Sequence, residues 1–318
     1  MKIIEKEQVR QLLKPGICIE LMKDAMLGLE NGTYAQPARL ITIMPNTAKF
    51  GFMPAYVGSY FGAKVISAYA PNMGTGYPSH IGYVMLFESE HSTVAGMIEA
   101  GSITEIRTGA VSAAATDLLA RKDAHSLAFV GAGAQARSHL AAIREIREIT
   151  SVTVYDLFPE AARRFKKEME AAYQIPVQVC ESVAEAVKEA DIICTVSPSK
   201  EPSLYASMVR PGTHINAVGT FTPNTREVAS DLVAASRLYA DQVEAMKLES
   251  GEYLIPLQEG LITEAHILGS IGGLLAGKAE GRKDDSQITL FDALGLAVED
   301  VACARYVYEQ LQAGSDCV

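Results

Sequence analysis

Residues 126–136 read SLAFVGAGAQA, an apolar β-type run that breaks into a G-x-G-x-x-A turn and continues into a helical stretch at 139–147. A strand, a glycine turn and a helix in this order are what a dinucleotide-binding turn requires. Gly131 permits the tight turn, Gly133 lets the backbone approach a pyrophosphate, and Ala136 keeps the helix close to the strand. The sequence therefore predicts a dinucleotide site in the middle of the chain.

The residues that follow this turn indicate which dinucleotide binds. Ala134 and Gln135 offer backbone N–H groups at the positive end of the helix dipole, where phosphates bind. The strand expected at 151–155 ends at Asp156, whose carboxylate can accept the ribose hydroxyls of NAD and repels a 2′-phosphate. NAD is therefore the favoured cofactor, while the two arginines at 163–164 leave NADP as an alternative.

Composition limits the classes of function. The chain has 318 residues, 48% of them apolar and 21% charged, which suggests about two domains with a large core. It contains no apolar run of roughly 20 residues and no apolar segment of a secretory signal at its start. A net charge of −10 with scattered basic residues disfavours nucleic acid and anionic membranes as partners. The five cysteines form no C-x-x-C pair and the six histidines no metal-binding spacing, so we expect a cytoplasmic protein with reduced thiols and no metal.

The second part of the chain has the pattern of an α/β domain. Short β-rich runs alternate with amphipathic helical runs such as 159–172 and 182–189, which is typical of a doubly wound parallel sheet of the Rossmann type. Its strands are expected at 126–130, 151–155, 177–180, 191–196, 213–218 and 237–240.

The first part has a different pattern. A helix at 14–30 precedes turn-rich strands that look antiparallel, which predicts a separate α+β domain for substrate binding and dimerisation. An Ala-rich helix at 104–120 connects the two parts, and an amphipathic helix at 292–312 is expected to pack back onto the first domain. These strands are expected at 39–44, 51–56, 63–69, 82–87 and 93–99. The predicted domains are residues 1–115 with a C-terminal helix at about 300–318, and a nucleotide-binding domain at 116–299.

Three basic residues of the first domain predict a site for a substrate that carries a carboxylate. Arg39 is expected at the entry to a strand, Lys64 at the start of another, and Arg107 at the start of the Ala-rich helix. Each by itself also fits a solvated charge or an ion pair. Arginine supplies an always-charged fork for a carboxylate, and a lysine in apolar surroundings has a lowered pKa, so that it can move a proton near neutral pH. With a nicotinamide, these residues predict redox chemistry at the Cα–N bond of an amino or imino acid, with Lys64 as the catalytic residue.

Further cofactor contacts are expected at the helix start and at the carboxyl ends of the strands. Thr108 offers a hydroxyl and an N-terminal helix N–H to a phosphate. Thr195 and Ser197 follow the fourth strand of the nucleotide-binding domain, and Val218 and Gly219 close the fifth, at the edge where ligands bind in open α/β sheets. A small polar loop at 195–198 is also what an ordinary connection looks like, so both interpretations stay open there.

The joint pattern resembles the ornithine cyclodeaminase/mu-crystallin family of NAD(P)-dependent enzymes, and most closely its Δ1-pyrroline-2-carboxylate and ketimine reductase branch. The motifs span nearly the whole chain in the family's order: PAR at 37–39, GAK at 62–64, ITEIRTGAVSAAATDLLA at 103–120, GAGAQA at 131–136, THINAVG at 213–219 and ITLFDALGLAVEDVA at 288–302. The resemblance implies a homodimer whose antiparallel first domains pack together beside a cofactor cleft. It also implies that Arg39 and Arg107 hold the substrate carboxylate, and that Lys64 hydrogen-bonds to the substrate or donates a proton.

The chain departs from the family pattern at one position. Cyclodeaminases and alanine dehydrogenases of the family have an aspartate two residues before a proline, just past the fifth strand, and Phe221 occupies that place here. A cyclodeaminase must hold the δ-ammonium of ornithine and move protons during ring closure, and a phenyl ring supplies neither charge nor proton transfer. Phe221 therefore suits an apolar wall of the substrate site. The alternative is that Phe221 only packs in a loop while another acid, such as Glu227 or Asp285, takes the role of the aspartate.

These observations predict an NAD(P)H-dependent oxidoreductase that reduces cyclic imino acids. Δ1-Pyrroline-2-carboxylate would give L-proline and Δ1-piperideine-2-carboxylate would give L-pipecolate, with Lys64 assisting proton delivery. The alternatives are an ornithine cyclodeaminase that forms L-proline and ammonia, an alanine dehydrogenase, and a non-catalytic NAD(P)-binding protein similar to mu-crystallin.

Overall fold

The computed structural model describes residues 2–72 and 75–313, and the chain divides into two compact units. Unit 1 comprises Met1–Arg107 and Leu296–Val318, and unit 2 comprises Thr108–Gly295. The sequence placed the boundaries at 115/116 and 299/300 instead. The first boundary of the structure falls inside the helix α3 (Ala100–Leu119).

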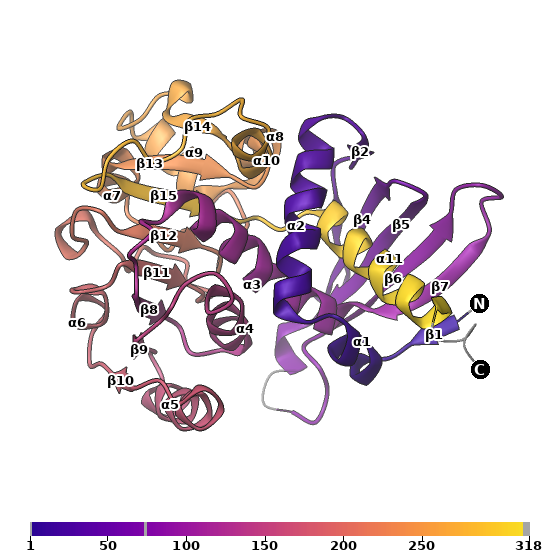
Figure 1. The fold of residues 1–318 in the computed structure, drawn as a ribbon, viewed down its shortest axis with the longest axis horizontal. Helices are drawn as coiled ribbons and strands as arrows, with labels where there is room; N and C mark the ends of the chain where they lie inside the picture. The colour runs from indigo at the N-terminus through magenta and orange to yellow at the C-terminus, as the bar shows by residue number, and fades with distance from the viewer. Residues whose placement is uncertain (1, 73–74, 314–318) are drawn as a thin grey trace. The chain divides into compact units, whose positions relative to one another are not determined.

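Unit 1 contains a mixed sheet with strands in the order β1-β7-β6-β5-β4-β2 and with β3 paired to β4 (Figure 1). The pairing of β1 with β7 is parallel and the other described pairings are antiparallel, which confirms the antiparallel strands expected from the sequence. The elements of this unit besides the first part of α3 are β1 (Lys2–Ile4), α1 (Lys6–Leu12), α2 (Pro15–Glu30), β2 (Tyr34–Ala35), β3 (Leu40–Ile43), β4 (Lys49–Val57), β5 (Tyr60–Ala68), η1 (Ala70–Asn72), β6 (His80–Glu88), β7 (Val94–Glu99) and α11 (Ala297–Ala313).

The register of this sheet assigns side chains to its two faces. Lys64 of β5 pairs with Met53 of β4 and with Val84 of β6, and directly opposite side chains of antiparallel strands lie on the same face. Met53 and Val84 are buried, and α11 packs along the four strands β4 to β7. Lys64 therefore points into the interior of unit 1, among apolar side chains.

Helix α2 packs beside α11 (Figure 1). It begins at Pro15, a position where the missing N–H of proline removes no helical hydrogen bond. Its buried side chains recur at Cys18, Met22 and Met26, one face of a helix. Cys18 Sγ lies 3.6 Å from the Sγ of Cys303 on α11. The four described cysteines are unpaired, buried thiols, as the sequence predicted, and Cys317 lies outside the described residues.

Unit 2 contains a parallel sheet of eight strands in the order β10-β9-β8-β11-β12-β15-β13-β14 (Figure 1). The first six positions have the strand order of a Rossmann sheet, so the predicted fold class is confirmed. Its strands are β8 (Ser126–Val130), β9 (Ser151–Tyr155), β10 (Val177–Val179), β11 (Ile192–Thr195), β12 (His214–Ala217), β13 (Ser236–Ala240), β14 (Ile267–Ser270) and β15 (Ile288–Asp292). Its helical elements besides α3 are α4 (Ala134–Ile143), α5 (Pro159–Tyr173), α6 (Val183–Val187), η2 (Ala206–Met208), α7 (Ser230–Ala235), α8 (Val243–Glu249), α9 (Gly251–Gln258), η3 (Glu264–His266) and α10 (Ile271–Leu275).

Four strands were not expected from the sequence. β15 lies between β12 and β13, so Asp292 ends a strand and does not begin the last helix, which starts at Ala297. A strand that is buried on both faces shows no alternation of polar and apolar residues, so the sequence does not separate β15 from the helix expected at 292–312. β1, β2 and β14 are too short to show a period. Residues 314–318 of the expected C-terminal helix lie outside the described part of the chain.

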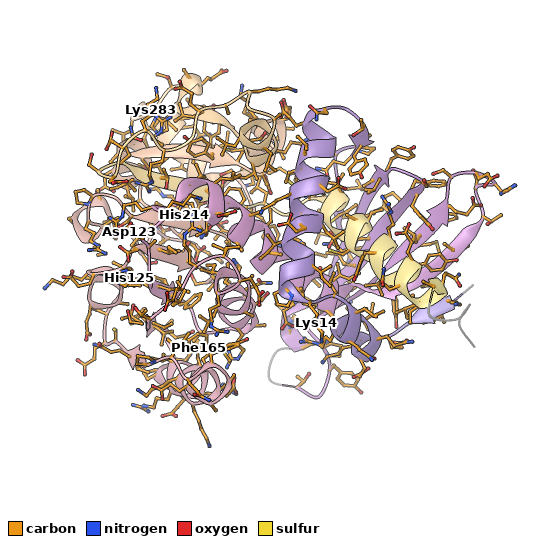
Figure 2. All side chains as sticks on the ribbon, in the orientation of Figure 1. Lys14, Asp123, His125, Phe165, His214 and Lys283 are labelled. Carbon is orange, nitrogen blue, oxygen red and sulfur yellow. The ribbon has the colours of Figure 1, made fainter. Side chains whose placement is uncertain are left out.

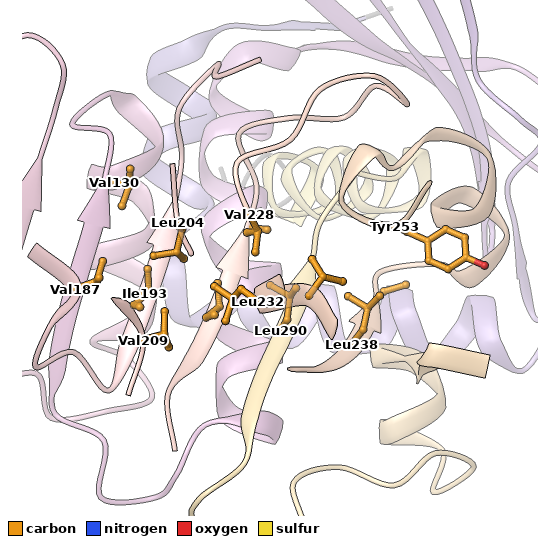
Figure 3. Close-up of a cluster of buried hydrophobic side chains, with 14 of the residues drawn as sticks. Val130, Val187, Ile193, Leu204, Val209, Val228, Leu232, Leu238, Tyr253 and Leu290 are labelled. Atoms are coloured by element: carbon orange, nitrogen blue, oxygen red, sulfur yellow. The ribbon is translucent and has the colours of Figure 1, made fainter. Parts of the chain in front are cut away.

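One face of the unit 2 sheet carries a continuous apolar core (Figure 3). Val130, Ile193 and Leu290 come from three different strands of the sheet. Leu232 of α7 and Tyr253 of α9 pack against them. This core fixes the strands whose carboxyl ends carry the predicted cofactor contacts.

The other face of this sheet is covered by further helices. Phe129 of β8 packs edge-on against Phe165 of α5, with ring centroids 5.4 Å apart (Figure 2 labels Phe165). Gly109 of α3 lies so close to α4 that a Cβ atom there would be 2.6 Å from Ser138 Oγ. Helices on both faces make this a doubly wound unit.

Candidate active site

Unit 1 buries four charged side chains together. Lys64 lies in the middle of β5, Arg107 lies on α3, and Glu299 and Asp300 lie in the first turn of α11. All four are nearly or fully inaccessible to solvent, and they form a network of ion pairs that we call the charged cluster. Two cations and two carboxylates balance in charge, which is the condition for burying such groups.

Lys64 is the amine of this cluster and is 3% exposed. Its Nζ lies 2.6 Å from Asp300 Oδ2 and donates a long hydrogen bond of 3.5 Å to Thr104 Oγ1. Burial lowers the pKa of Lys64, the Asp300 carboxylate counteracts this, and the charge of Arg107 lowers the pKa further. The net effect is a pKa below the usual lysine value, as expected for a lysine that moves protons.

Arg107 is held by both acids. Its Nη1 donates to Glu299 Oε2 at 2.7 Å, and its Nε lies 3.4 Å from Asp300 Oδ1. Burial acts to lower the pKa of Arg107, but the carboxylates of Glu299 and Asp300 outweigh it and raise the pKa. The guanidinium is therefore charged at any ordinary pH, and its buried Nε has no hydrogen-bond partner among the described residues.

Glu299 and Asp300 pair with two predicted site residues and were not themselves predicted as site residues. Glu299 also accepts a hydrogen bond from the backbone N–H of Leu296, which caps the start of α11. Two adjacent acids at the beginning of an apolar helix were visible in the sequence. Acidic residues are common in the first turn of a helix, so this pair by itself does not signal a site.

The structure corrects three sequence-based positions. Lys64 is in the middle of its strand and not at its start. The connecting helix begins at Ala100 and not at 104, so Arg107 and Thr108 lie in its interior. An interior N–H is bonded to a carbonyl four residues earlier, so Thr108 does not offer an N-terminal helix N–H to a phosphate.

Arg39 is half-buried and lies directly before β3, as the sequence predicted. The next residue, Leu40, pairs with Phe52, and the residue after Phe52 is Met53, the partner of Lys64. The backbone at Arg39 therefore runs beside the strand positions that carry Lys64.

The glycine turn of unit 2 has the geometry of a phosphate cradle. Gly131 has φ of +106°, and a Cβ there would lie 2.9 Å from the Val196 carbonyl oxygen, so the position requires glycine. A Cβ on Gly133 would meet no atom within 4 Å. Gly133 is the N-cap of α4 and provides no side-chain cap, so the first N–H groups of α4, at Ala134 and Gln135, lie beside open space. This turn and the first N–H groups of α4 therefore fit the phosphates of a dinucleotide.

Asp156 lies just after β9 and contacts this turn. Its Oδ2 accepts from the backbone N–H of Ala132 at 2.7 Å, and its Oδ1 accepts from Phe158 N–H at 2.8 Å. Asp156 thereby joins the glycine turn to the end of the next strand. The second lone pair of each oxygen remains for ribose hydroxyls, so the predicted role of Asp156 stays a prediction.

The other predicted cofactor residues gather at the carboxyl edge of the sheet. Thr195 ends β11 and is fully buried, Ser197 follows it, and Val218 and Gly219 follow β12, the neighbouring strand. Phe221 lies in the loop beyond Gly219 and is 51% exposed. Thr195 and Ser197 therefore lie near Val218 and Gly219, while Lys64 and Arg107 belong to unit 1.

The described residues contain neither a candidate metal site nor a candidate membrane span. No group of three or more His, Cys, Asp or Glu side chains among them is arranged to hold a metal ion. None of the helices in residues 2–72 and 75–313 is both long and apolar enough to cross a membrane.

A Rossmann unit with a glycine cradle, combined with a mixed-sheet unit that buries a lysine–arginine cluster, defines a class of two-unit nucleotide-binding proteins. The family model of the ornithine cyclodeaminase/mu-crystallin family matches residues 2–315, and the chain belongs to this family.

Two relatives illustrate the range of the family. A Δ1-pyrroline-2-carboxylate reductase of Bacillus cereus is 34% identical over 250 residues, covering 78% of this chain and 77% of that protein. The ketimine reductase mu-crystallin of Mus musculus is 34% identical over 287 residues, covering 89% of this chain and 88% of that protein. Both names denote reductases, in agreement with the predicted oxidoreductase class.

Two solved structures are similar over almost the whole chain. The Thermococcus litoralis Δ1-pyrroline-2-carboxylate reductase in complex with NADH and L-proline has a TM-score of 0.95 and 35% identity, covering 99% of this chain and 98% of that one. An archaeal alanine dehydrogenase dimer with bound NAD has a TM-score of 0.93 and 29% identity, covering 98% of this chain and 96% of that one. NADH and NAD are thus the nucleotides in these relatives, in agreement with the predicted cofactor.

Proposed function

We propose that this chain is an NADH-dependent reductase of cyclic 2-imino carboxylates, with Δ1-pyrroline-2-carboxylate as the first substrate to test. The observation that carries the proposal is the buried pair of Lys64 and Arg107 in unit 1. The Thermococcus reductase, which is similar over 99% of this chain, was solved with NADH and L-proline, the cofactor and product that this reaction would use and give.

The substrate carboxylate is assigned to the arginines. Arg107 is held in place by Glu299 and Asp300. A guanidinium that is fixed before binding loses little conformational entropy when it binds a carboxylate. Arg39 is assigned the same carboxylate because its backbone runs beside the strand positions of Lys64.

We assign to Lys64 the delivery of a proton to the substrate. A bound nicotinamide supplies the hydride for reduction of the C=N bond. The imine nitrogen must then receive a proton, and Lys64 carries one at a lowered pKa with Asp300 2.6 Å away to stabilise the ammonium form. Burial of the cluster excludes water, which would otherwise hydrolyse the imine.

The cofactor is assigned to unit 2, with NAD favoured over NADP. The phosphates are assigned to the turn at Gly131 and Gly133 and to the first N–H groups of α4. Asp156 repels a 2′-phosphate at the ribose. Arg163 forms an ion pair with Glu160, so its charge is already matched on the surface of α5. This pairing supports NAD.

Phe221 supports reduction of a preformed ring over cyclisation of ornithine. It is half exposed in the loop beyond β12, where an apolar wall can contact a ring. Glu227, an alternative acid for cyclodeamination, is fully buried and its carboxylate accepts hydrogen bonds from Ser197 and Gly219. Its oxygens are therefore engaged in the protein.

A spectrophotometric panel tests the proposal. Purified protein is assayed with NADH and with NADPH against Δ1-pyrroline-2-carboxylate, Δ1-piperideine-2-carboxylate, and pyruvate with ammonia, and with NAD against L-ornithine. We expect NADH oxidation with the cyclic imines, and L-proline as the product from the five-membered ring. Release of ammonia from ornithine without imine reduction would make the chain a cyclodeaminase. Turnover of pyruvate and ammonia alone would make it an alanine dehydrogenase, and cofactor binding without any turnover a binding protein.

We further propose a homodimer that forms through the outer face of the unit 1 sheet. Phe52 pairs with Leu40 on one side and with Val65 on the other, and these residues lie on the face opposite to Lys64 and α11. Phe52 and Leu40 are exposed, as is Ile81 of β6. The outer face of an antiparallel sheet in a monomer is ordinarily polar, and an apolar one is typical of an interface.

The oligomeric state in solution tests this interface. We expect a dimer by light scattering, and a monomer for Phe52→Lys. Leu248→Lys is the matched control, because Leu248 is an exposed leucine on α8 of unit 2. Dissociation by both variants, or by neither, would contradict the proposed interface. The cytoplasmic location also remains a proposal, and fractionation of the native host tests it.

A further inference from the structure

The carboxyl edge of the unit 2 sheet contains a buried carboxylate that the proposed reaction does not use. β11 and β12 are neighbours, with Thr195 paired to Ala217 at their ends. The chain leaves each strand in a loop, and these loops carry Ser197 and Gly219, two predicted cofactor contacts. The side chain of Glu227, which is fully buried, lies between the two loops.

Glu227 binds one loop with each of its oxygens. Oε1 accepts from both the backbone N–H and the hydroxyl of Ser197, each at 2.7 Å. Oε2 accepts from the backbone N–H of Gly219, also at 2.7 Å. Burial raises the pKa of Glu227, and the hydrogen bonds from Ser197 and Gly219 act against this rise. Because both of its oxygens are bonded, the Glu227 side chain fixes the distance between the two loops.

Gly219 is adapted to this contact. A Cβ atom at Gly219 would lie 2.7 Å from Glu227 Oε2 and 2.0 Å from the Ser197 carbonyl oxygen. The glycine is therefore required by the approach of the two loops to each other, whether or not a nicotinamide also passes close to it. This finding gives the position a structural reason that the sequence did not provide.

A second buried acid, Glu252, binds the backbone of Glu227. Glu252, in the first turn of α9, accepts the backbone N–H of Glu227 at 2.7 Å and the hydroxyl of Thr220 at 3.1 Å. Thr220 lies between Gly219 and Phe221 in the chain. Through Glu252, the hydrogen bonds around Glu227 therefore extend to the residue directly before Phe221, which we propose as an apolar wall of the substrate site.

We propose that Glu227, supported by Glu252, is the positioning residue of the nicotinamide end of the cofactor site, because it fixes the loops of Ser197 and Gly219 at the spacing that the cofactor requires. The proposal rests on the proposed function only in taking a nicotinamide nucleotide as the ligand. Glu227 touches neither substrate nor cofactor in this account and acts through the loop backbones.

The test measures NADH binding directly. The chain has no Trp, so the fluorescence of NADH can be titrated without a tryptophan background. Glu227→Gln retains the size of the side chain but turns an amide N–H₂ toward one of the two loops, where a backbone N–H needs an acceptor. We expect the Kd for NADH to rise roughly tenfold. Glu227→Asp keeps the charge on a shorter arm and is expected to lose less affinity.

Asp191→Asn is the matched control. Asp191 is also a buried acid that accepts backbone N–H groups, but it lies before β11, at the amino end of the sheet, with His125 and Ser126 (Figure 2 labels His125). We expect Asp191→Asn to lower the melting temperature with no change in the Kd for NADH. Thr220→Val removes a hydroxyl that contacts Glu252 and is expected to raise the Kd roughly threefold, which keeps the proposal testable if Glu227→Gln does not fold.

The outcomes separate this proposal from the proposed function. Wild-type affinity in folded Glu227→Gln, or equal losses in Glu227→Gln and Asp191→Asn, would overturn the positioning role and leave imine reduction intact. A wild-type chain that binds NADH but reduces no imine would refute the proposed reaction alone. A wild-type chain that binds neither NADH nor NADPH would overturn both.

Discussion

Lys64 and Asp300 form an ion pair in the interior of unit 1, with Nζ and Oδ2 2.6 Å apart. One residue lies on a strand of the first sheet and the other on the last helix of the chain. The pair is shared with Arg107, whose Nε lies 3.4 Å from the other carboxylate oxygen. Asp300 therefore couples the proposed proton donor to the proposed carboxylate ligand, and substitutions at these residues are expected to separate the two roles.

Lys64→Met removes the amine and retains an apolar side chain of similar length. We expect kcat for imine reduction to fall by about 10²–10⁴-fold, the usual contribution of a positioned acid or base. The Kd for NADH is expected to stay unchanged, because the glycine turn belongs to unit 2. Steady-state kinetics and NADH titration measure the two quantities. Equal losses in both would contradict a role in proton delivery.

Asp300→Asn is expected to change the pH dependence. The Asp300 carboxylate raises the pKa of Lys64 against the effect of burial, so its removal lowers that pKa further. If the ammonium form is the active one, activity is lost as the pH rises through the pKa of Lys64, and this alkaline limb moves to lower pH in the variant. The measurement is kcat/KM against pH for both proteins, with a melting curve to confirm folding. An unchanged alkaline limb would show that Asp300 does not set the protonation of Lys64.

Arg107→Lys tests the carboxylate ligand. Lysine keeps the positive charge but lacks the planar fork that Glu299 and Asp300 orient. We expect KM for the imino acid to rise roughly tenfold or more, with a smaller change in kcat. Glu299→Gln keeps Arg107 and weakens one of its two pairs, so it is expected to raise KM less. A loss confined to kcat in Arg107→Lys would place Arg107 in the chemical step and not in binding.

Glu252→Gln is expected to change how stability depends on pH. Burial raises the pKa of Glu252 from 4.5 to about 7. Protonated Glu252 therefore contributes its full stability to the fold at pH values below 4.5, the pKa of this group in the unfolded chain. That stabilisation is lost as the pH rises through about 7, by an amount on the order of 3 kcal/mol. Relative to Glu252→Gln, the wild-type protein should therefore lose stability between about pH 5 and pH 8.

Urea unfolding at pH 5, 6, 7 and 8 measures this difference. Burial lowers the pKa of His139 to about 4 and that of His214 to about 3, so both histidines destabilise the fold on the acid side. They are present in both proteins and cancel in the comparison. A difference that does not change with pH would mean that Glu252 stays ionised in the folded chain.

Much of the nucleotide-binding unit was predictable because its signals are local. The strand at 126–130, the turn at Gly131 and Gly133, and Asp156 after the next strand are each encoded within a few residues, by backbone freedom and apolar runs. The exception is β15, which enters the sheet between β12 and β13. Its place depends on pairing with strands far away in the chain, and no local pattern specifies it.

The sequence by itself determined the two-part organisation, the glycine turn and the family motifs, and it indicated Lys64 and Arg107 as candidate site residues. Only the tertiary structure decided that Glu299 and Asp300 hold these two residues, and that Glu227 joins the loops of Ser197 and Gly219. The physical reason is that an acidic side chain looks the same in a sequence whether water or a buried cation surrounds it. Its surroundings depend on which distant segments pack against it, and burial then decides its charge and its role.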